Sequence, residues 1–145
     1  MKNIILGIFT VFILTVLSNC SASKMNKSEH YQREWMMISF DHFTKSQLIE
    51  NKAAIDLTGE KTGNVVKGSA KMGCNTIFFQ AEFKNNGKIH ILEIVNTEMA
   101  CKNRELETAF LKNFGNMKNY TVEGHRLTLS DGSENTMEFI AADWD

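Results

Sequence analysis

The chain has 145 residues, of which 16 are basic and 17 are acidic, for a formal net charge of −1. This balance argues against a nucleic-acid-binding protein, because such a protein needs a stripe of lysines and arginines to contact phosphates, and the sequence has no basic cluster of that kind. No internal repeat or low-complexity segment is visible.

The first 19 residues are typical of an export signal. Lys2 supplies a positive start, and residues 4–17 form an almost unbroken apolar stretch. That stretch is too short to span a bilayer comfortably, so it indicates a segment that is cleaved and not a membrane helix.

The sequence Leu17-Ser18-Asn19-Cys20 resembles a bacterial lipobox, in which the cysteine thiol receives a diacylglycerol and the chain is cut just before it. Asn19 departs from that pattern, since the residue before the cysteine is usually Gly, Ala or Ser. A secretory cut after Ala22 is therefore the alternative. We expect lipid on Cys20 to hold the protein at a membrane. By resemblance to such lipoproteins, Ser21 favours the outer membrane, facing the periplasm; a soluble periplasmic or secreted protein is the alternative.

The chain then divides into three segments. Residues 1–19 are the predicted signal peptide, residues 20–30 a lipid-anchored flexible tether, and residues 31–145 a single domain. Residues 21–28 are small, polar and lysine-containing, as expected of a tether. The remaining length suits one hydrophobic core and leaves no room for a second domain.

Two strands are predicted at the start of the domain. The first covers residues 35–43 and begins at Trp35, and the second covers residues 53–58. Alternation places Ile55 and Leu57 on the buried face of the second strand.

The clearest predicted element is a β-hairpin in the middle of the chain. Apolar side chains alternate toward one face of its first strand: Ile77, Phe79, Ala81 and Phe83. Asn85-Asn86-Gly87 forms the turn, and Ile89 and Ile91 follow on the returning strand. Asn-Gly between alternating apolar runs is a strong hairpin signal, because both residues tolerate the positive φ of a type I′ turn.

A helix is predicted over residues 103–117. Asn103 is its expected N-cap, and Gly115 is expected to end it in the left-handed conformation. One side carries the residues at helical spacing: Leu106, Ala109, Phe110, Asn113, Phe114 and Met117.

The last third of the chain predicts a meander of three short strands. Their inward residues are Tyr120, Val122, Leu127, Leu129, Met137 and Phe139. Turns are predicted at residues 123–125 and 130–133. The elements together predict an α+β domain, with a curled, mainly antiparallel sheet and one packed helix.

The cysteines divide by position. If Cys20 carries lipid, Cys74 and Cys101 form an even set in an oxidising compartment, which predicts a disulfide. The bridge is expected to stabilise the fold by roughly 3 to 4 kcal/mol on the chain-entropy model. A reactive thiolate is the alternative, because Cys101 lies just before the predicted helix, whose start can lower a thiol pKa.

Three segments occur in order along the chain. They are Gly73-Cys74-Asn75-Thr76-Ile77-Phe78, then Thr97-Glu98-Met99-Ala100-Cys101 ahead of a helix with Glu107 and Phe110, then Tyr120-x-x-x-Gly124-x-x-Leu127-x-Leu129. With Trp35 in the opening strand, this set resembles the META domain, also called the HslJ-like family, over roughly residues 34–140.

The resemblance implies a curled antiparallel sheet with one packed helix. It also implies a small exported or lipid-anchored bacterial protein associated with heat shock, envelope stress, drug tolerance or motility. The family has no established catalytic residues. Its motif residues in this chain are Gly73, Cys74, Asn75, Thr97, Met99, Ala100 and Cys101.

Other candidate residues favour structural roles. The four histidines, His30, His42, His90 and His125, are scattered without the spacing of paired metal ligands, so neither a metal nor a cofactor is expected. Asn75 and Thr97 are expected to satisfy backbone groups at strand ends. Phe78 is expected to pack under the helix, with an exposed partner or lipid site as the alternative. Trp144 is expected to hold the last strand against the body.

The sequence therefore predicts a non-enzymatic envelope lipoprotein that binds or stabilises something under stress. We expect contact with an unidentified envelope protein through a sheet edge or an apolar groove. The alternative is a carrier that encloses an apolar ligand, such as a fatty acyl chain, among Phe78, Phe79 and Phe83. A thiol-dependent enzyme, for example with a dyad of Cys74 and His90, is the third reading.

Overall fold

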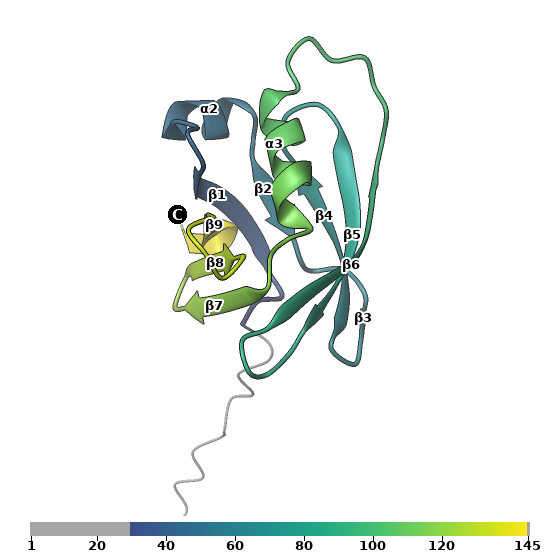
Figure 1. The fold of residues 1–145 in the computed structure, drawn as a ribbon, viewed down its shortest axis with the longest axis vertical. Helices are drawn as coiled ribbons and strands as arrows, with labels where there is room; N and C mark the ends of the chain where they lie inside the picture. Colours follow the sequence, from purple (N-terminus) through teal and green to yellow (C-terminus); the bar gives the residue numbers. More distant parts are fainter. Residues whose placement is uncertain (1–29, 145) are drawn as a thin grey trace, which may run out of the picture.

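The structure is a computed structural model that describes residues 30–144. The predicted signal peptide, the lipid site at Cys20, the alternative cut after Ala22 and most of the tether lie outside these residues. Nine antiparallel strands form one sheet in the order β6-β5-β4-β2-β1-β9-β8-β7, with β3 paired to β4 (Figure 1). Their bounds are β1 Glu34–Phe40, β2 Ala54–Asp56, β3 Lys61–Thr62, β4 Val65–Lys71, β5 Thr76–Phe83, β6 Ile89–Asn96, β7 Asn119–Glu123, β8 Arg126–Ser130 and β9 Thr136–Ala141.

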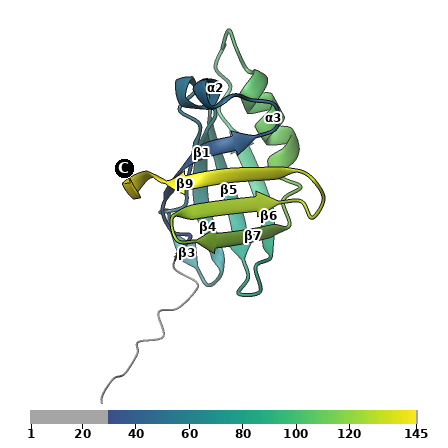
Figure 2. The same ribbon diagram turned by 90° about the vertical axis from the view of Figure 1, so that its left-hand side faces the viewer.

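The sheet curls until its two edge strands approach each other at one end. Figure 2 shows β1, β9, β8 and β7 crossing in front of β4, β5 and β6. Ile89 N donates to Lys118 O at 3.0 Å, and Tyr120 N donates to Gly87 O at 2.8 Å, so β6 and β7 meet where both strands begin. The predicted curled antiparallel sheet of an α+β domain is confirmed.

Helix α3 (Glu105–Phe114) covers the concave face of the sheet. Phe110 stacks on Phe114 at 4.6 Å between ring centroids, and Phe114 meets Phe79 of β5 edge-on at 4.9 Å. The helix is shorter than predicted, and its N-cap is Arg104 in place of the predicted Asn103. Gly115 has φ −62°, so the predicted left-handed cap is wrong; the chain leaves α3 in a right-handed turn in which Met117 N donates to Phe114 O.

A second, short helix was not predicted. α2 (Lys45–Glu50) begins with a capping box, in which Gln47 N donates to Thr44 Oγ1 at 3.3 Å and Thr44 N donates to Gln47 Oε1 at 2.8 Å. Thr44-x-x-Gln47 is the sequence signature of this motif. Leu48 is its one buried residue, so the helix has too little apolar periodicity to be seen as amphipathic.

The predicted hairpin is formed by β5 and β6, and its four alternating residues are buried. The turn differs from the expected type I′, because only Gly87 has a positive φ (78°). Lys84 N donates to Lys88 O and Gly87 N donates to Lys84 O, the pattern of a type I turn followed by a left-handed glycine. This glycine alone provides the positive φ that the hairpin needs.

Phe78 is 52% exposed, so its predicted burial under the helix is wrong. Neighbouring residues of a strand point to opposite faces, and Phe79 occupies the concave face beneath α3. Phe78 therefore lies on the convex face, which no helix of the described chain covers.

The end of the domain where the chain enters is held by aromatic side chains. Tyr31 stacks on Phe83 with 4.1 Å between ring centroids, and Tyr120 meets both rings edge-on. Trp35 Nε1 donates to Tyr31 O at 2.8 Å. Burial raises the pKa of both Tyr31 and Tyr120.

The predicted meander of three strands is formed by β7, β8 and β9. It is followed by a short 3-10 helix, η2 (Ala142–Trp144). Trp144 is 56% exposed and its ring stacks on His125 at 3.5 Å. Trp144 therefore does contact the β7–β8 turn, from the surface and not from the core.

Candidate functional site

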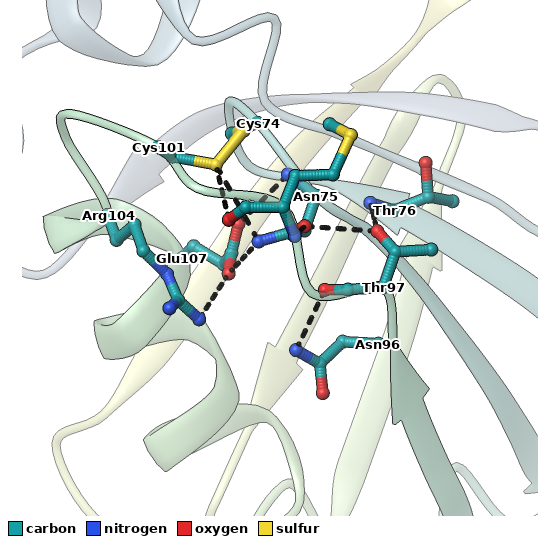
Figure 3. Close-up of a disulfide and its surroundings, with 9 residues drawn as sticks. Cys74, Asn75, Thr76, Asn96, Thr97, Cys101, Arg104 and Glu107 are labelled. Atoms are coloured by element: carbon teal, nitrogen blue, oxygen red, sulfur yellow. Dashed lines mark hydrogen bonds and ion pairs between the residues drawn. A yellow bond between two sulfur atoms is a disulfide. The ribbon is translucent and has the colours of Figure 1, made fainter.

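The motif residues meet where β5 begins and α3 covers it (Figure 3). Asn75, just before β5, and Glu107, in the first turn of α3, are the two buried polar residues of the described core, at 0% and 1% exposure. Each has its polar atoms satisfied by the other or by neighbouring chain, as buried polar groups require. We call these residues, with Thr97 and the backbone of Met99, the Asn75 cluster.

Glu107 accepts hydrogen bonds through both carboxylate oxygens. Asn75 Nδ2 donates to Oε1 at 2.9 Å, and the backbone N of Asn75 donates to Oε2 at 3.1 Å. Arg104 Nη2 lies 3.3 Å from Oε1, and its side chain is 46% exposed. The carboxylate thus attaches α3 to the start of β5.

The side-chain oxygen of Asn75 holds the loop that follows β6. Asn75 Oδ1 accepts from Met99 N at 2.8 Å and from Thr97 Oγ1 at 3.1 Å, and Thr76 N donates to Thr97 Oγ1 at 3.1 Å. One amide side chain therefore connects β5, the loop and α3. The Met99 side chain is left 54% exposed.

A disulfide joins Cys74 to Cys101 beside this cluster, as the sequence predicts, with 6.2 Å between the two Cα atoms. Gly73 precedes it with φ +117°, and a Cβ at this position would lie 2.7 Å from Asn51 Oδ1. Both the backbone angle and the close contact require glycine here. Ala100 lies in the same loop and is exposed. We call this region, with the Asn75 cluster, the disulfide end.

The geometry of the disulfide end favours a clamp over a catalytic centre. Asn75 and Glu107 direct their polar atoms at each other and at backbone groups, and the two sulfurs are bonded to each other. A disulfide sulfur has no thiolate to act as a nucleophile. The proposed dyad is not assembled either, because His90 pairs with Glu82 near the far end of β5, roughly 20 Å from Asn75 at about 3.3 Å per residue.

The remaining histidines occupy separate surface positions. His42 lies 3.1 Å from Asp41 and 3.5 Å from Glu105, and these hydrogen bonds, the one to Asp41 first, raise the pKa of His42. His125 contacts Trp144 and Arg33. Residues 30–144 contain no group of three or more His, Cys, Asp or Glu placed to hold a metal ion.

Glu107 belongs to the segments that resemble the META domain, but no buried role was predicted for it. Its buried role had a detectable signal, because Glu107 stands three and seven residues before Phe110 and Phe114, on the face that meets the core. An acid at such a position needs a buried partner, and Asn75 is that partner.

A second candidate surface lies on the convex face of β5 and β6. Phe78 pairs across the two strands with Val95, and Leu92 lies three residues earlier in β6, where the pairing register shifts; the exposures of Phe78, Val95 and Leu92 are 52%, 54% and 56%. We call these three residues the apolar patch. Two shallow grooves of about 210 and 230 Å³ flank Phe78, and both are lined by Lys67 and Gly68.

The rings proposed to enclose an apolar ligand are not brought together. Phe79 and Phe83 are buried on the concave side, each against other rings, while Phe78 lies on the convex side. Aromatic contacts join the helix to the sheet where a carrier would hold its ligand. Among residues 30–144, no helix is long and apolar enough to cross a membrane.

The META domain profile matches residues 28–144, which is most of the sequence and nearly all of the described domain. The chain belongs to the META domain family. The META domain is not a known family of enzymes. No curated protein sequence matches the chain.

Two NMR structures have similar folds. One covers 82% of this chain and 97% of its own, with a TM-score of 0.62 and 22% identity. The other, a protein from Burkholderia xenovorans, covers 81% of this chain and 88% of its own, with a TM-score of 0.61 and 17% identity. At these identities the likeness supports the META fold alone.

Proposed function

We propose that this META-domain protein is a lipid-anchored protein of the bacterial envelope that works by binding an extended segment of another envelope protein, without catalysis. The observation that carries this proposal is the apolar patch beside the free edge of β6. β6 ends the strand order, and beyond Ile89, whose N donates to Lys118 O just before β7, no strand in the described part of the chain pairs with its outer side.

An edge strand offers unpaired backbone N–H and C=O groups that can pair with an added strand. β6 has eight residues, long enough for several backbone hydrogen bonds. Val95 stands on that edge strand and would contact side chains of the added strand, with Phe78 behind it on β5. The expected partner segment is therefore extended and carries apolar residues at every second position.

Two features support a location outside the cytosol. The sequence ending at Cys20 resembles a lipobox, and the disulfide between Cys74 and Cys101 is a bond that persists in oxidising compartments. Lipid on Cys20 would place the domain at a membrane surface, the outer membrane by resemblance, where a stress-associated binding role has its partners within reach.

The Asn75 cluster supports a binding function over a catalytic one. Asn75 and Glu107 use their hydrogen-bonding capacity inside the protein, which leaves them no group to offer a substrate. The same contacts hold the loop that follows β6 at Thr97 and Met99, so the end of the edge strand is fixed in place. A rigid edge loses less entropy when it binds a partner.

In-cell photocrosslinking tests the partner. A crosslinking amino acid replaces Val95 in the patch, and a matched control replaces Thr121, which is exposed on β7 at the opposite edge of the sheet. Under envelope stress we expect the Val95 position, and not the Thr121 position, to capture the same envelope protein repeatedly. Equal capture at both positions, or none, contradicts the proposal.

Intact-mass measurement of the exported protein tests the location. Diacylglycerol on a chain that begins at Cys20 is the expected product. A chain that begins at Ser23 and carries no lipid would contradict the anchor at Cys20. The partner hypothesis would then be decided by the crosslinking result alone.

A further inference from the structure

The chain enters the domain at the end opposite the disulfide. His30 lies at a cavity of about 430 Å³ whose other walls come from the β5–β6 turn and from β7: Asn85, Asn86, Gly87, Tyr120, Thr121, Val122 and Glu123. Asn75 lies just before β5 and the turn lies just after it, so the eight residues of the strand, about 27 Å, separate the two ends. Figure 1 shows the loop before α3 at one extreme of the domain and the β5–β6 turn toward the other. We call the region around His30 and the β5–β6 turn the entry end.

The tether restricts how the domain can lie on a membrane. His30 is ten positions after Cys20 in the sequence, and a fully extended chain of that length spans at most about 35 Å. A flexible chain of ten residues has an average end-to-end distance of only about 17 Å. The entry end is therefore kept close to any bilayer that holds the anchor, while the disulfide end can approach it only if the tether stretches along the domain.

The entry end carries lysines. Lys84 and Lys88 flank the β5–β6 turn and pair through their backbones, and Lys61 Nζ lies 5.5 Å above the ring of Tyr31. Lys118 is exposed and its carbonyl accepts from Ile89 N at the same end. Three acids lie near these four lysines: Glu82, which is 3.4 Å from Lys84; Glu60, which precedes Lys61 and forms an ion pair with Lys67; and Glu123 at the cavity. Because Glu60 is paired with Lys67, the four lysines remain in excess.

The tether adds to this charge. Its residues 20–30 contain Lys24 and Lys27 against one acid, Glu29. The chain as a whole has a net charge of −1, so this positive charge is a local feature of the tether and the entry end. Lysines next to a membrane are attracted by anionic phospholipid headgroups.

We infer that the entry end is a membrane-docking face, on which Lys61, Lys84 and Lys88 contact anionic phospholipid headgroups. The inference rests on the proposed anchor at Cys20. Docking in this way sets the long axis of β5 away from the bilayer. Phe78 is five residues from the end of β5, so the apolar patch is held roughly 17 Å further from the membrane than the turn.

Lysine footprinting of the native chain tests the docking face. The lipid-carrying protein is placed on phosphatidylcholine vesicles with or without phosphatidylglycerol, its amines are acetylated, and each lysine is quantified by mass spectrometry. The matched controls are Lys52 and Lys71 at the disulfide end: Lys71 pairs with Thr76, and Lys52 follows Asn51, which contacts Gly73. Both control lysines are exposed.

With phosphatidylglycerol we expect the reactivity of Lys61, Lys84 and Lys88 to fall about fivefold, the attraction that one lysine gains at an anionic surface. Lys52 and Lys71 should keep their reactivity. High salt should restore the lost reactivity, because it screens the attraction. The double substitution Lys84→Gln/Lys88→Gln should also reduce the protection of Lys61, whereas Lys52→Gln/Lys71→Gln should not.

Flotation of the same vesicles separates the two ideas. Protein that floats with them but shows equal reactivity at both ends, or protection at Lys52 and Lys71, overturns the docking face and leaves the lipid anchor intact. Protein that does not float and has an unmodified Cys20 by mass removes the anchor, and the docking face with it.

Discussion

The two ends of this domain are held together by different physical forces. At the disulfide end, a covalent bond and the Asn75 cluster fix the loop before α3 through polar contacts of defined geometry. At the entry end, Tyr31, Phe83 and Tyr120 pack as a cluster of rings, and backbone hydrogen bonds join β6 to β7. We expect the ring cluster to tolerate substitutions that keep the rings and change a polar group at their edge. We expect the Asn75 cluster to lose stability when one hydrogen-bond acceptor is removed.

The comparison shows why the two ends of the domain place different requirements on their residues. A ring cluster is stabilised by buried area and shape, which several apolar residues can supply. A buried polar cluster is stabilised only when every donor meets an acceptor, so each member is specified. Substitutions in the ring cluster, the disulfide and the Asn75 cluster test that difference, and a change in the β8–β9 turn tests a contribution from outside both ends.

Truncation of the ring cluster should have the largest effect. Tyr31→Ala removes the ring that stacks on Phe83 and should lower the free energy of unfolding by about 3–5 kcal/mol, the usual cost of deleting a buried aromatic side chain. Urea unfolding followed by circular dichroism measures it. Tyr31→Phe keeps the ring and is the control; if it costs as much as Tyr31→Ala, packing is not what holds the entry end.

Removal of the disulfide should have the next largest effect. The double substitution Cys74→Ala/Cys101→Ala opens a loop with a sequence separation of 27 and should cost about 3–4 kcal/mol on the chain-entropy model. Urea midpoints of the oxidised wild type and the variant give the value. A loss well below 1 kcal/mol would show that the Asn75 cluster alone holds this end.

Glu107→Gln tests the polar cluster with little change in shape. It replaces one acceptor by an amide donor, which must face one of the two Asn75 donors, and should cost about 1–3 kcal/mol. Glu105→Gln, two residues away and exposed, is the matched control and should change stability by less than about 0.5 kcal/mol. Equal midpoints for the two variants would contradict the assignment of Glu107 as the partner of Asn75.

The smallest expected effect is a pH dependence that belongs to neither end. Asp131, in the β8–β9 turn, accepts hydrogen bonds from Asn135 and Ser133, and these lower the pKa of its carboxyl to about 2. A lowered native pKa stabilises the fold above the unfolded value, about pH 4, and this contribution is lost as the pH falls toward 2. Asp131→Asn should flatten the stability profile in that window only. If the free energy of unfolding of the wild type and of Asp131→Asn falls with the same slope in this pH window, the lowered pKa of Asp131 is refuted.

Much of the fold was predictable because its signals are local. The β5–β6 hairpin and the three strands of the meander follow from apolar alternation and from turn residues such as Gly87 and Gly124. β4 lacks a clear apolar alternation, because Gly68 interrupts its pattern where a Cβ would lie 2.4 Å from the Phe79 ring. The glycine makes sense only once the strand next to it is known.

The candidate site was predictable in part. The disulfide partners and the importance of Asn75 and Thr97 follow from the cysteine count and the family motifs, and both polar residues do satisfy backbone groups as expected. Glu107 and the exposure of Phe78 did not follow. Both depend on which face of β5 the helix covers, a question that period-two alternation leaves open because it distinguishes two faces without saying which one is packed.

The sequence by itself determined the strand pattern, the main helix, the family and the residues from which the two ends are built, because periodicity, turn chemistry and motif order are properties of neighbouring residues. Only the tertiary structure decided that α3 covers the concave face, that Asn75 and Glu107 satisfy each other across a sequence separation of 32, and that β6 meets β7 only at its start. Those outcomes depend on contacts between distant segments. The curl of the sheet selects such contacts, and no local pattern encodes them.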